Sequence, residues 1–500
     1  MEEAPTRLID RPVWIVGAVG AAVRLAWVSI ASRTPTGLSD PILYFGAANG
    51  IAHGDGYLSI KGTVTSYYPP GYPYFLGGVQ WLLERVGLGD HLALGAGIVQ
   101  AVLGGVACGA VVVAGTRLGR QVTPVGRGPV RVGVSAGLVL ALWPNLIAYS
   151  AAILSETLFV TLFAVFLAAV LTMSDGAVSD RAVSDRAVSD TAVSDRAMLD
   201  GAMSGGVVSR TATTRPWRAV TAGVSLGAAT LVRPQVLVVA AAMVLSWILS
   251  RVGWRSVLVR GAWLAAGVVV VVAPWTVRNL GVFDAFVPVS TNGGDNLCVG
   301  FHDGAPGFFV IPPSCDTGEF YTEGPAAELR RNRETRARAT SWIRSNLAEV
   351  PVLSVKKLWY TYRSDTDGLR AVESYDADPF LAGWRTPLQV LSTVAYLAIM
   401  AAALVGAVVV AGPGWRGRRH DATGLAVLAA ALASFLVPVL VFGDPRFKVP
   451  ATPSFALLAG VAVVAVLDRL GRGADLPPDP RAGPATEDDD GQDRPAPASS

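Results

Sequence analysis

The sequence is a succession of long apolar runs separated by polar segments. A helix that crosses the hydrocarbon core of a bilayer needs about 20 predominantly apolar residues. The runs that approach or reach this length are residues 13–31, 92–115, 131–150, 155–173, 218–232, 234–250, 260–279, 386–411, 423–442 and 449–468. The fifth is short, so it and the sixth form either two spans or a tight hairpin. The pattern predicts an all-α, polytopic membrane protein of about ten or more transmembrane helices.

The arginines between these runs indicate how the chain is oriented. They gather on one side of the predicted bundle: Arg7, Arg11, Arg117, Arg120, Arg127, Arg131, Arg251, Arg255, Arg260, Arg416, Arg418, Arg419, Arg469 and Arg472. Cytoplasmic loops carry an excess of Arg and Lys. We therefore expect a multi-pass plasma-membrane protein whose opposite loops, 32–91 and 280–384, are extracytoplasmic. Arg24 interrupts the first run, which favours a retained helix over a cleaved signal peptide.

The polar segments divide the chain further. We expect an N-terminal membrane part (1–173) containing the outer loop 32–91, a repeat insert (174–216), membrane helices (217–279), an outer loop region (280–384), C-terminal membrane helices (385–470) and a tail (471–500). The insert repeats the pentad AVSDR and the tail is rich in Pro and Asp, so we expect both to be disordered. Within the second outer loop, residues 325–347 and 345–364 predict helices, the second with a pattern suited to the membrane surface.

Composition agrees with a membrane protein. Hydrophobic residues make up 52% of the 500 residues and charged residues only 16%, and the mean hydropathy is +0.45. The net charge is +3 and forms no basic face, so nothing supports nucleic-acid binding.

Charged residues at the outer ends of the apolar runs are the candidate functional groups. Asp40 follows the first run, Glu156 begins the fourth, Arg233 lies between the fifth and sixth, and Arg446 and Lys448 lie between the last two. A charge at the centre of a membrane helix costs roughly 2.5–3.5 kcal/mol on insertion scales, so such residues are candidates by default.

Each candidate also has a structural interpretation. Asp40 or Glu156 could cap a helix N-terminus, whereas Arg446 and Lys448 could extend to lipid headgroups. Arg24 could be an ion-pair partner inside the bundle.

Aromatic and potential metal-binding residues lie near Asp40 in the sequence. Tyr67 and Tyr68 could bind the donor or simply belong to an interfacial aromatic belt. His53 lies beside a GDG turn that contains Asp55, and a single His in such a place is weak evidence for a metal site. In the second outer loop Cys298 and Cys315 could form a disulfide in an oxidising compartment.

The order of several motifs resembles a known family. The motifs are D-x-x-x-Y (Asp40, Tyr44), GDGY (54–57), YPPGYP (68–73), SETLF (155–159), LVRP (231–234), APWTVRNLGVFDAFVPVSTNGGDNL (273–297), IRSNLAEVPVLSVKKLW (343–359) and GDPRFKVPATP (443–453). Together they resemble the GT-C glycosyltransferases, in the branch related to the bacterial lipid A aminoarabinose transferase and protein O-mannosyltransferases. The resemblance covers roughly residues 12–467.

The resemblance implies a GT-C-like helical bundle with extracytoplasmic loop helices. It implies an inverting transfer of a sugar from a polyprenyl-phosphate carrier to a lipid, glycan or protein acceptor outside the cytoplasm. Asp40 matches the family's general base and Glu156 its second acidic position. A divalent metal, Mg²⁺ or Mn²⁺, is expected from the family more than from the residues, with Asp40, Glu156 and His53 as the candidate ligands.

The residues independently suit such a reaction. A carboxylate can take the proton of the acceptor hydroxyl, and arginines can stabilise the departing phosphate. The expected ligands of the donor phosphate and lipid are Arg233, Arg446, Lys448, Arg24, Tyr44, Tyr67 and Tyr68. A lipid or solute transporter or flippase and a non-catalytic subunit of envelope assembly remain alternatives.

Overall fold

The computed structural model describes residues 4–36, 40–123, 126–173, 216–250, 252–318, 323–375, 383–412 and 422–474. The expected disordered insert and tail lie outside these residues, apart from Pro216 and the end of the last helix. The helices of the membrane bundle are α1 (Ala4–Ala31), α4 (Leu92–Val122), α5 (Gly128–Ala141), α6 (Pro144–Ala148), α7 (Glu156–Thr172), α9 (Pro216–Val232), α10 (Val236–Leu249), α11 (Trp254–Phe283), α16 (Arg385–Ala411), α18 (Thr423–Ala433), α19 (Leu436–Leu440) and α20 (Thr452–Ala474).

The connecting segments contain further helices. These are α2 (Asp40–His53), α3 (Gly71–Arg85), α12 (Gly293–Gly300), α13 (Pro325–Ser345), α14 (Val350–Tyr362) and α15 (Asp367–Glu373), with the 3₁₀ helices η1 (Gly89–His91), η2 (Pro313–Cys315) and η4 (Pro445–Ala451). The two helices predicted in the second outer loop are confirmed as α13 and α14. The described residues contain isolated β-bridges only, between Leu58 and Val64 and between Phe308 and Gly443.

Every predicted apolar run contains a helix, and the chain is a multi-pass membrane protein. Six helices in the described part of the chain are long and apolar enough to cross a bilayer: Arg11–Ala31, Gly89–Val122, Trp254–Phe283, Arg385–Ala411, Thr423–Leu440 and Pro445–Leu470. The apolar helices α5, α7 and α10 are shorter.

The third predicted span, 131–150, is wrong at its C-terminal end. Helix α5 stops at Ala141, and the short α6 begins only at Pro144. Trp143 is extended, with ψ of 111°, because a residue before proline is driven out of the helical region. The chain then turns and enters α7 at Glu156, so this break places the start of α7 among the loops at one end of the bundle.

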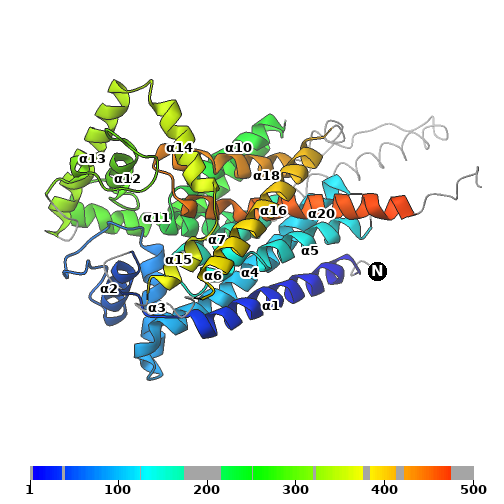
Figure 1. Cartoon of the computed structure of the whole chain (residues 1–500), viewed down its shortest axis with the longest axis horizontal. Helices are drawn as coiled ribbons and strands as arrows, with labels where there is room; N and C mark the ends of the chain where they lie inside the picture. Colours follow the sequence, from blue (N-terminus) through cyan, green and yellow to red (C-terminus); the bar gives the residue numbers. More distant parts are fainter. Residues whose placement is uncertain are drawn as a thin grey trace, which may run out of the picture.

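The bundle has buried central helices and lipid-facing outer ones. Helix α4 packs against α1, α5 and α7, and α20 packs against α5 and α16 (Figure 1). In the most apolar 18-residue stretch of Pro445–Leu470, 83% of the residues are buried, whereas in that of Trp254–Phe283 only 17% are buried. Apolar side chains left outward on α11 and α16 are expected where the surrounding solvent is lipid.

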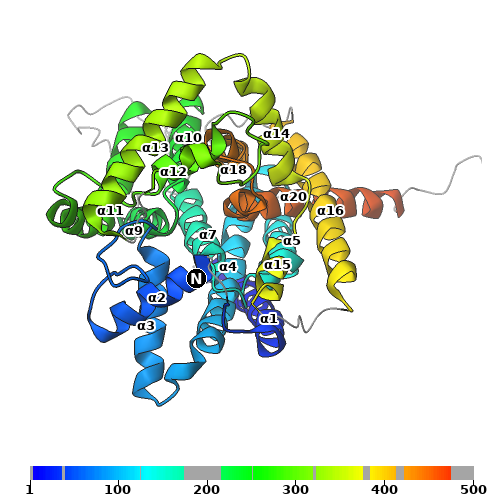
Figure 2. The ribbon, with the colours of Figure 1, turned by 60° about the vertical axis from the view of Figure 1, so that its left-hand side comes forward.

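The non-membrane helices gather at one end of the bundle. Figure 1 places α2, α3, α12 and α13 at the end opposite the N-terminus, and in Figure 2 α12 and α13 lie above α2 and α3. Two segments far apart in sequence meet there: Thr291 donates its backbone N–H to the carbonyl of Ser66, and Glu328 on α13 accepts hydrogen bonds from Thr65 and from the Ser66 backbone. We call this region the loop end.

Candidate active site

Asp40 is the first residue of α2, at the loop end. Its Oδ1 accepts a hydrogen bond from Tyr68 Oη at 2.8 Å, and its Oδ2 pairs with Arg446 Nη1 at 2.8 Å. Burial raises the pKa of the Asp40 carboxyl, but the nearby Arg446 and the hydrogen bond from Tyr68 outweigh it, so the pKa lies below the usual value. Asp40 is therefore a carboxylate at neutral pH.

Glu156 is the first residue of α7 and is almost completely buried. Its Oε1 accepts hydrogen bonds from Arg233 Nη2 and Arg446 Nε, both at 2.5 Å. Arg233, between α9 and α10, also donates Nε–H to Ser155 Oγ at 3.0 Å. The N-terminus of a helix favours a negative charge, so α7 supports the carboxylate on which the two arginines are fixed.

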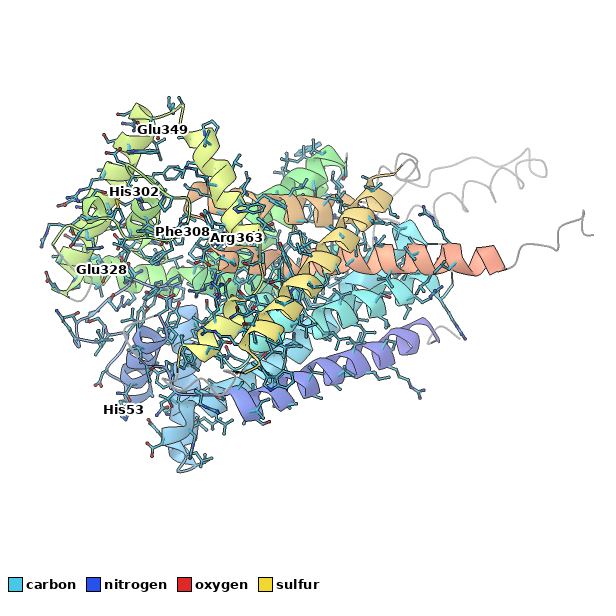
Figure 3. All side chains as sticks on the ribbon, in the orientation of Figure 1. His53, His302, Phe308, Glu328, Glu349 and Arg363 are labelled. Carbon is cyan, nitrogen blue, oxygen red and sulfur yellow. A yellow bond between two sulfur atoms is a disulfide. The ribbon has the colours of Figure 1, made fainter. Side chains whose placement is uncertain are left out.

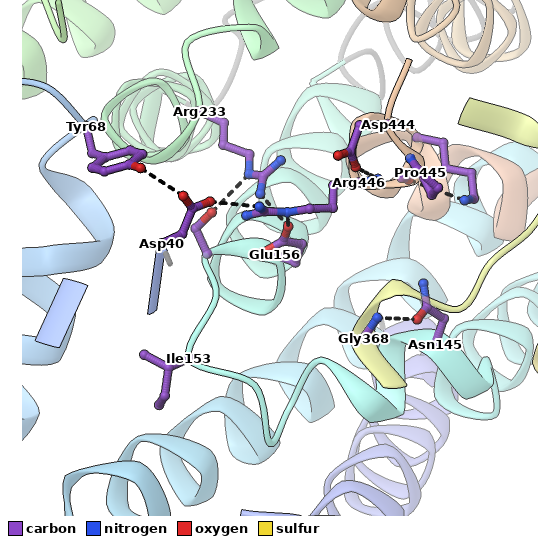
Figure 4. A network of polar contacts seen from close by, with 12 residues as sticks. Asp40, Tyr68, Asn145, Ile153, Glu156, Arg233, Gly368, Asp444, Pro445 and Arg446 are labelled. Atoms are coloured by element: carbon purple, nitrogen blue, oxygen red, sulfur yellow. Dashed lines mark hydrogen bonds and ion pairs between the residues drawn. The ribbon is translucent and has the colours of Figure 1, made fainter. Parts of the chain in front are cut away.

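Arg446 joins the two acids. It lies in η4, whose first turn is closed by a hydrogen bond from the Arg446 backbone N–H to Asp444 Oδ1. Its guanidinium contacts Asp40 on one side and Glu156 on the other (Figure 4). Residues separated by more than 400 positions thus form one cluster, which we call the Asp40–Arg446 cluster: Asp40, Tyr68, Ser155, Glu156, Arg233 and Arg446.

The cluster keeps hydrogen-bonding capacity unused. Neither Nη1 of Arg233 nor Nη2 of Arg446 has a hydrogen-bond partner among the described residues. Oε2 of Glu156 is buried and likewise has no partner there. Two guanidinium groups held side by side, each with a free donor nitrogen, suit an anion with several oxygens, such as a phosphate.

Aromatic rings line the side of Asp40. Tyr44 and Tyr68 pack edge to face with centroids 5.3 Å apart, and Tyr44 packs in the same manner against Tyr72 at 5.1 Å. Tyr44 thus lies next to the cluster, as expected from its position one helical turn after Asp40. Tyr67 points elsewhere, with its hydroxyl donating to Asp295 at 2.8 Å.

Two predicted phosphate ligands are not part of the cluster. Arg24 is buried, and its guanidinium donates to the carbonyls of Gly20, Leu140 and Ala141; it closes the end of α5 and makes no ion pair of the kind expected. The fully buried Lys448 pairs with Asp365 at 3.1 Å and donates to three backbone carbonyls. The four acceptors around Lys448 occupy its three N–H groups, and the guanidinium of Arg24 is directed at the end of α5.

The predicted metal ligands do not come together. Asp40 and His53 lie at opposite ends of the 14-residue α2, which at 1.5 Å per residue separates them by about 20 Å. His53 contacts the Asn49 carbonyl and lies 3.8 Å from Glu84, at the edge of the molecule (Figure 3). In the described part of the chain no group of three or more His, Cys, Asp or Glu could hold a metal. Asp40 and Glu156 instead share a guanidinium, so this donor set does not fit a divalent cation.

Several residues around the site were not identified from the sequence. Glu328 accepts three hydrogen bonds, from Thr65, Thr291 and the Ser66 backbone, and so fixes the segment before Tyr67 and Tyr68. Glu328 is the only acid in the first two turns of the strongly basic helix α13. This isolated negative charge was the feature of the sequence that could have identified it. Cys298 and Cys315, whose pairing the sequence left open, form a disulfide.

An apolar cleft lies next to Arg233. Its volume is about 320 Å³, and it is lined by Pro70, Gly71, Tyr74, Leu231, Val271, Pro274, Trp275 and Arg278. Leu231 is two residues from Arg233, and Gly71 packs so closely on α9 that an added Cβ would lie 2.9 Å from the Leu231 backbone. The cleft therefore lies between the start of α3 and the membrane helices α9 and α11, with Leu231 two residues before Arg233.

Comparisons with known proteins identify the fold. No family model and no curated protein matches the sequence. Among solved structures, an Archaeoglobus fulgidus oligosaccharyltransferase tethered to an acceptor peptide matches with a TM-score of 0.53 and 13% identity, over 94% of this chain and 51% of that one. A second structure, of the oligosaccharyltransferase AglB of the same organism with an inhibitory peptide and a dolichol-phosphate, gives a TM-score of 0.48, 16% identity and coverages of 93% and 51%. ArnT from Cupriavidus metallidurans bound to undecaprenyl phosphate gives 0.44, 15% identity and coverages of 92% and 62%.

The chain thus has the fold of the GT-C membrane enzymes, as the sequence motifs predicted. It spans about half the length of the archaeal oligosaccharyltransferases that it matches (51%). At such low identity the likeness concerns the fold, and the activity must be argued from the site itself.

Proposed function

We propose that the chain is a membrane glycosyltransferase that moves a sugar from a polyprenyl-phosphate carrier to a lipid, glycan or protein acceptor on the extracytoplasmic side. The observation that carries the proposal is the pair of arginines fixed on Glu156, each with a free donor nitrogen, beside the partly exposed carboxylate of Asp40. An anion site next to a base is what displacement of a phosphate by a hydroxyl requires.

The reaction is a single displacement at the anomeric carbon. Asp40 takes the proton of the acceptor hydroxyl as the oxygen attacks that carbon. The bond from the carbon to the phosphate oxygen breaks, and the phosphate leaves with the electron pair. Arg233 and Arg446 stabilise the charge that grows on the leaving phosphate. One displacement inverts the anomeric configuration.

The 320 Å³ cleft suits the lipid part of the donor. A phosphate between Arg233 and Arg446 would place the first isoprene units near Leu231, which lines the cleft. Its walls are mainly apolar side chains of membrane helices, and Arg278 is the only charged residue that lines it. Burial of apolar surface is worth roughly 25 cal/mol per Å², so such a cleft can contribute much of the affinity for a polyprenyl chain.

The orientation is supported by two kinds of residue. The short loops on the side away from the loop end are rich in arginine, and it is the short loops that follow the positive-inside rule. The disulfide between Cys298 and Cys315 lies in the second predicted outer loop, and disulfides persist in oxidising compartments outside the cytoplasm.

The test is sugar release by the purified full-length chain. Isotope-labelled polyprenyl-phosphate sugar is incubated with the chain and with its Asp40→Asn variant, and free polyprenyl phosphate is measured. We expect release by the unchanged chain alone. A transporter would move the lipid between leaflets of a vesicle with the glycosidic bond intact, and an assembly subunit would bind it without release. Either result would overturn the proposal.

A further inference from the structure

A second, smaller cavity lies at the loop end, separate from the Asp40–Arg446 cluster. Its volume is about 70 Å³, and it is lined by Tyr67, Asp295, Asn296, Val299, Phe309, Ile311, Cys315 and Arg331. Phe309 and Ile311 on its lining are exposed, so the cavity opens to the surface. It therefore suits a single ring-sized group that protrudes in part, and not a polymer.

Asp295 is the polar centre of this cavity. The residue is 8% exposed. Its Oδ2 accepts hydrogen bonds from Tyr67 Oη at 2.8 Å and from Arg331 Nε at 2.9 Å. Its Oδ1 is buried and has no partner among the described residues. A buried carboxylate oxygen needs a donor, and here the donor has to come from whatever enters the cavity.

The ion pair with Arg331 sets the charge that the cavity accepts. Arg331 compensates the charge of Asp295, so the polar wall is close to neutral and selects an uncharged ligand. Phe309 and Ile311 offer exposed apolar surface on the lining. A ligand with hydroxyl groups on one edge and C–H groups on its face complements both kinds of wall.

The cavity is connected to the Asp40–Arg446 cluster on two sides. The rings of Tyr67 and Tyr68 meet edge to face at 5.0 Å, and Tyr68 bonds to Asp40.

On the other side three phenylalanines form a path. Phe309 packs on Phe442 at 5.2 Å, and Phe442 packs on Phe447 at 5.1 Å, directly after Arg446 in the sequence. The same two segments pair through the backbone, since Gly443 donates its N–H to the Gly307 carbonyl at 2.8 Å. A unit in the cavity is thus linked to the proposed base through Tyr67 and Tyr68, and to the segment of Arg446 through the three phenylalanines.

The cavity wall is covalently fixed. Cys298 on α12 is bonded to Cys315 in η2, and Asp295 lies one turn before Cys298. The wall that carries Asp295 and the wall that carries Cys315 therefore keep their spacing when the cavity is empty, which lowers the cost of binding.

We propose that this cavity is a recognition subsite for a single uncharged sugar ring, whose hydroxyl groups donate to Asp295 Oδ1 and whose apolar face packs against Phe309. The inference rests on the proposed function, which makes a sugar the hydroxyl-bearing ligand expected here. The ring is either the sugar carried by the donor or a sugar of the acceptor. Both have the same chemistry, and the experiment separates them.

Sugar binding is measured without any donor lipid or turnover. Saturation-transfer NMR on the purified full-length chain uses the methyl glycosides of mannose, galactose, glucose and arabinose as probes. We expect at least one to bind the unchanged chain, with its ring protons saturated. Asp295→Asn should weaken that binding at least tenfold, because the amide places an N–H group where a hydroxyl has to be accepted.

The matched control is Asp316→Asn. Asp316 is more exposed and lies 3.9 Å from the same Arg331, so the variant perturbs that arginine without changing the cavity lining. We expect it to bind the probes like the unchanged chain. Ile311→Trp tests the site without touching Asp295, because the larger side chain fills the opening and should abolish binding.

Two results would overturn the inference. The first is that none of the four probes binds the unchanged chain. The second is that Asp295→Asn binds the probes as well as Asp316→Asn does, and that Ile311→Trp binds them as well as the unchanged chain does. In a transfer assay, a higher KM of Asp295→Asn for the donor assigns the ring to the donor, and a higher KM for the acceptor assigns it to the acceptor. Sugar binding that persists in a chain without transferase activity would reject the proposed function and keep the subsite.

Discussion

Glu156 and Asp40 are both carboxylates, but their surroundings suit them to different roles. The Glu156 side chain is 1% exposed and holds two arginines, whereas the Asp40 side chain is 33% exposed. An acceptor hydroxyl can reach Asp40 but would have to displace an arginine to reach Glu156 Oε1. Buried ion pairs contribute little net stability, so a network of this kind is better explained by the charge it has to bind. We therefore propose that Asp40 is the base and that Glu156 positions the arginines.

Replacing Asp40 with Asn should lower the transfer rate by about 10²- to 10⁴-fold, because the amide keeps the shape but cannot take a proton. Donor binding should change little. The rate should stay constant down to about pH 4, since the pKa of Asp40 lies below its usual value. His53→Ala is the control on the same helix, and we expect it to be as active as the parent. Near-normal turnover of Asp40→Asn would transfer the role of base to Glu156.

Replacing Arg233 or Arg446 with Lys keeps the charge but removes the fork of donors. A hydrogen bond to a charged group is worth roughly 1.5–3 kcal/mol, which corresponds to about 10- to 100-fold in donor affinity. We expect donor binding and transfer to weaken together, and both are measured with a polyprenyl-phosphate sugar labelled in the sugar.

Arg385→Lys is the comparison for these variants. Arg385 also pairs with an acid, Glu373, at 2.8 Å, but lies at the start of α16 outside the cluster. Its Lys variant should bind donor normally. Equal behaviour of all three variants would place the phosphate elsewhere.

Lys357 on α14 makes stability depend on pH. It is fully buried, with Nζ 3.2 Å from the centroid of the Phe301 ring, and burial lowers its pKa to about 7. Between that value and the unfolded pKa of about 10.4, the unfolded chain binds more protons than the folded one. Stability should therefore rise with pH across this window.

Lys357→Met should remove this rise and stabilise the chain at neutral pH. Thermal unfolding in detergent between about pH 7 and pH 10 measures the effect. Lys356→Met, at the exposed neighbouring position, should keep the pH dependence of the parent. A flat profile for the unchanged chain would contradict the proposed cost of burying Lys357.

At the scale of elements, the site depends on how closely α3 approaches α9. Gly71 begins α3, and a Cβ there would lie 2.7 Å from a methyl group of Val232 and 2.9 Å from the Leu231 backbone. The same short segment carries Tyr68, which bonds to Asp40, and Arg233 follows Val232. A spacing change of a few tenths of an ångström at Gly71 is thus transmitted to both sides of the cluster.

Gly71→Ala should consequently reduce transfer at least tenfold while the chain still folds, because misplacement by about 1 Å can cost 10²-fold in rate. Gly78→Ala on the same helix is the matched control, since a Cβ there meets nothing within 4 Å. We expect its activity to equal that of the parent. Transfer rates and elution profiles of both variants provide the measurement.

The sequence predicted the elements better than their contacts. Apolar runs reveal helices because they are a local feature, although the break before Pro144 was missed. Asp40, Glu156, Arg233 and Arg446 stood out as charges at the ends of these runs. The partner of each charge is a tertiary property. Lys448 looked like Arg446 from the sequence, but its fully buried position opposite Asp365 depends on the loop between α14 and α15. The prediction that His53 shares a metal site with Asp40 did not consider geometry, because the helix that begins at Asp40 places His53 about 20 Å away.

At the scale of the whole molecule, the Asp40–Arg446 cluster lies at one end of the membrane bundle. Helix α4 has 31 residues and spans about 46 Å at 1.5 Å per residue, so its two ends lie on opposite sides of the bilayer. Transport sites lie near the bilayer midplane between repeats. The Asp40–Arg446 cluster instead lies where helices begin, beside the loops. This position suits an enzyme whose donor is a membrane lipid and whose acceptor arrives from the aqueous side.

The orientation of the bundle gives the last prediction. Glu349 is exposed between α13 and α14 at the loop end, and Arg127 is exposed between α4 and α5, beyond the far end of α4. Each is replaced by Cys in turn and treated with a membrane-impermeant maleimide. The native Cys298 and Cys315 are bonded to each other and Cys108 is buried, so the background should be low. Glu349→Cys should react in intact cells, and Arg127→Cys only after permeabilisation, because short arginine-rich loops such as the one between α4 and α5 stay in the cytoplasm, whereas long loops are translocated largely regardless of their charge. The reverse pattern would put the Asp40–Arg446 cluster on the cytoplasmic side, and the donor would then have to be used from the inner leaflet.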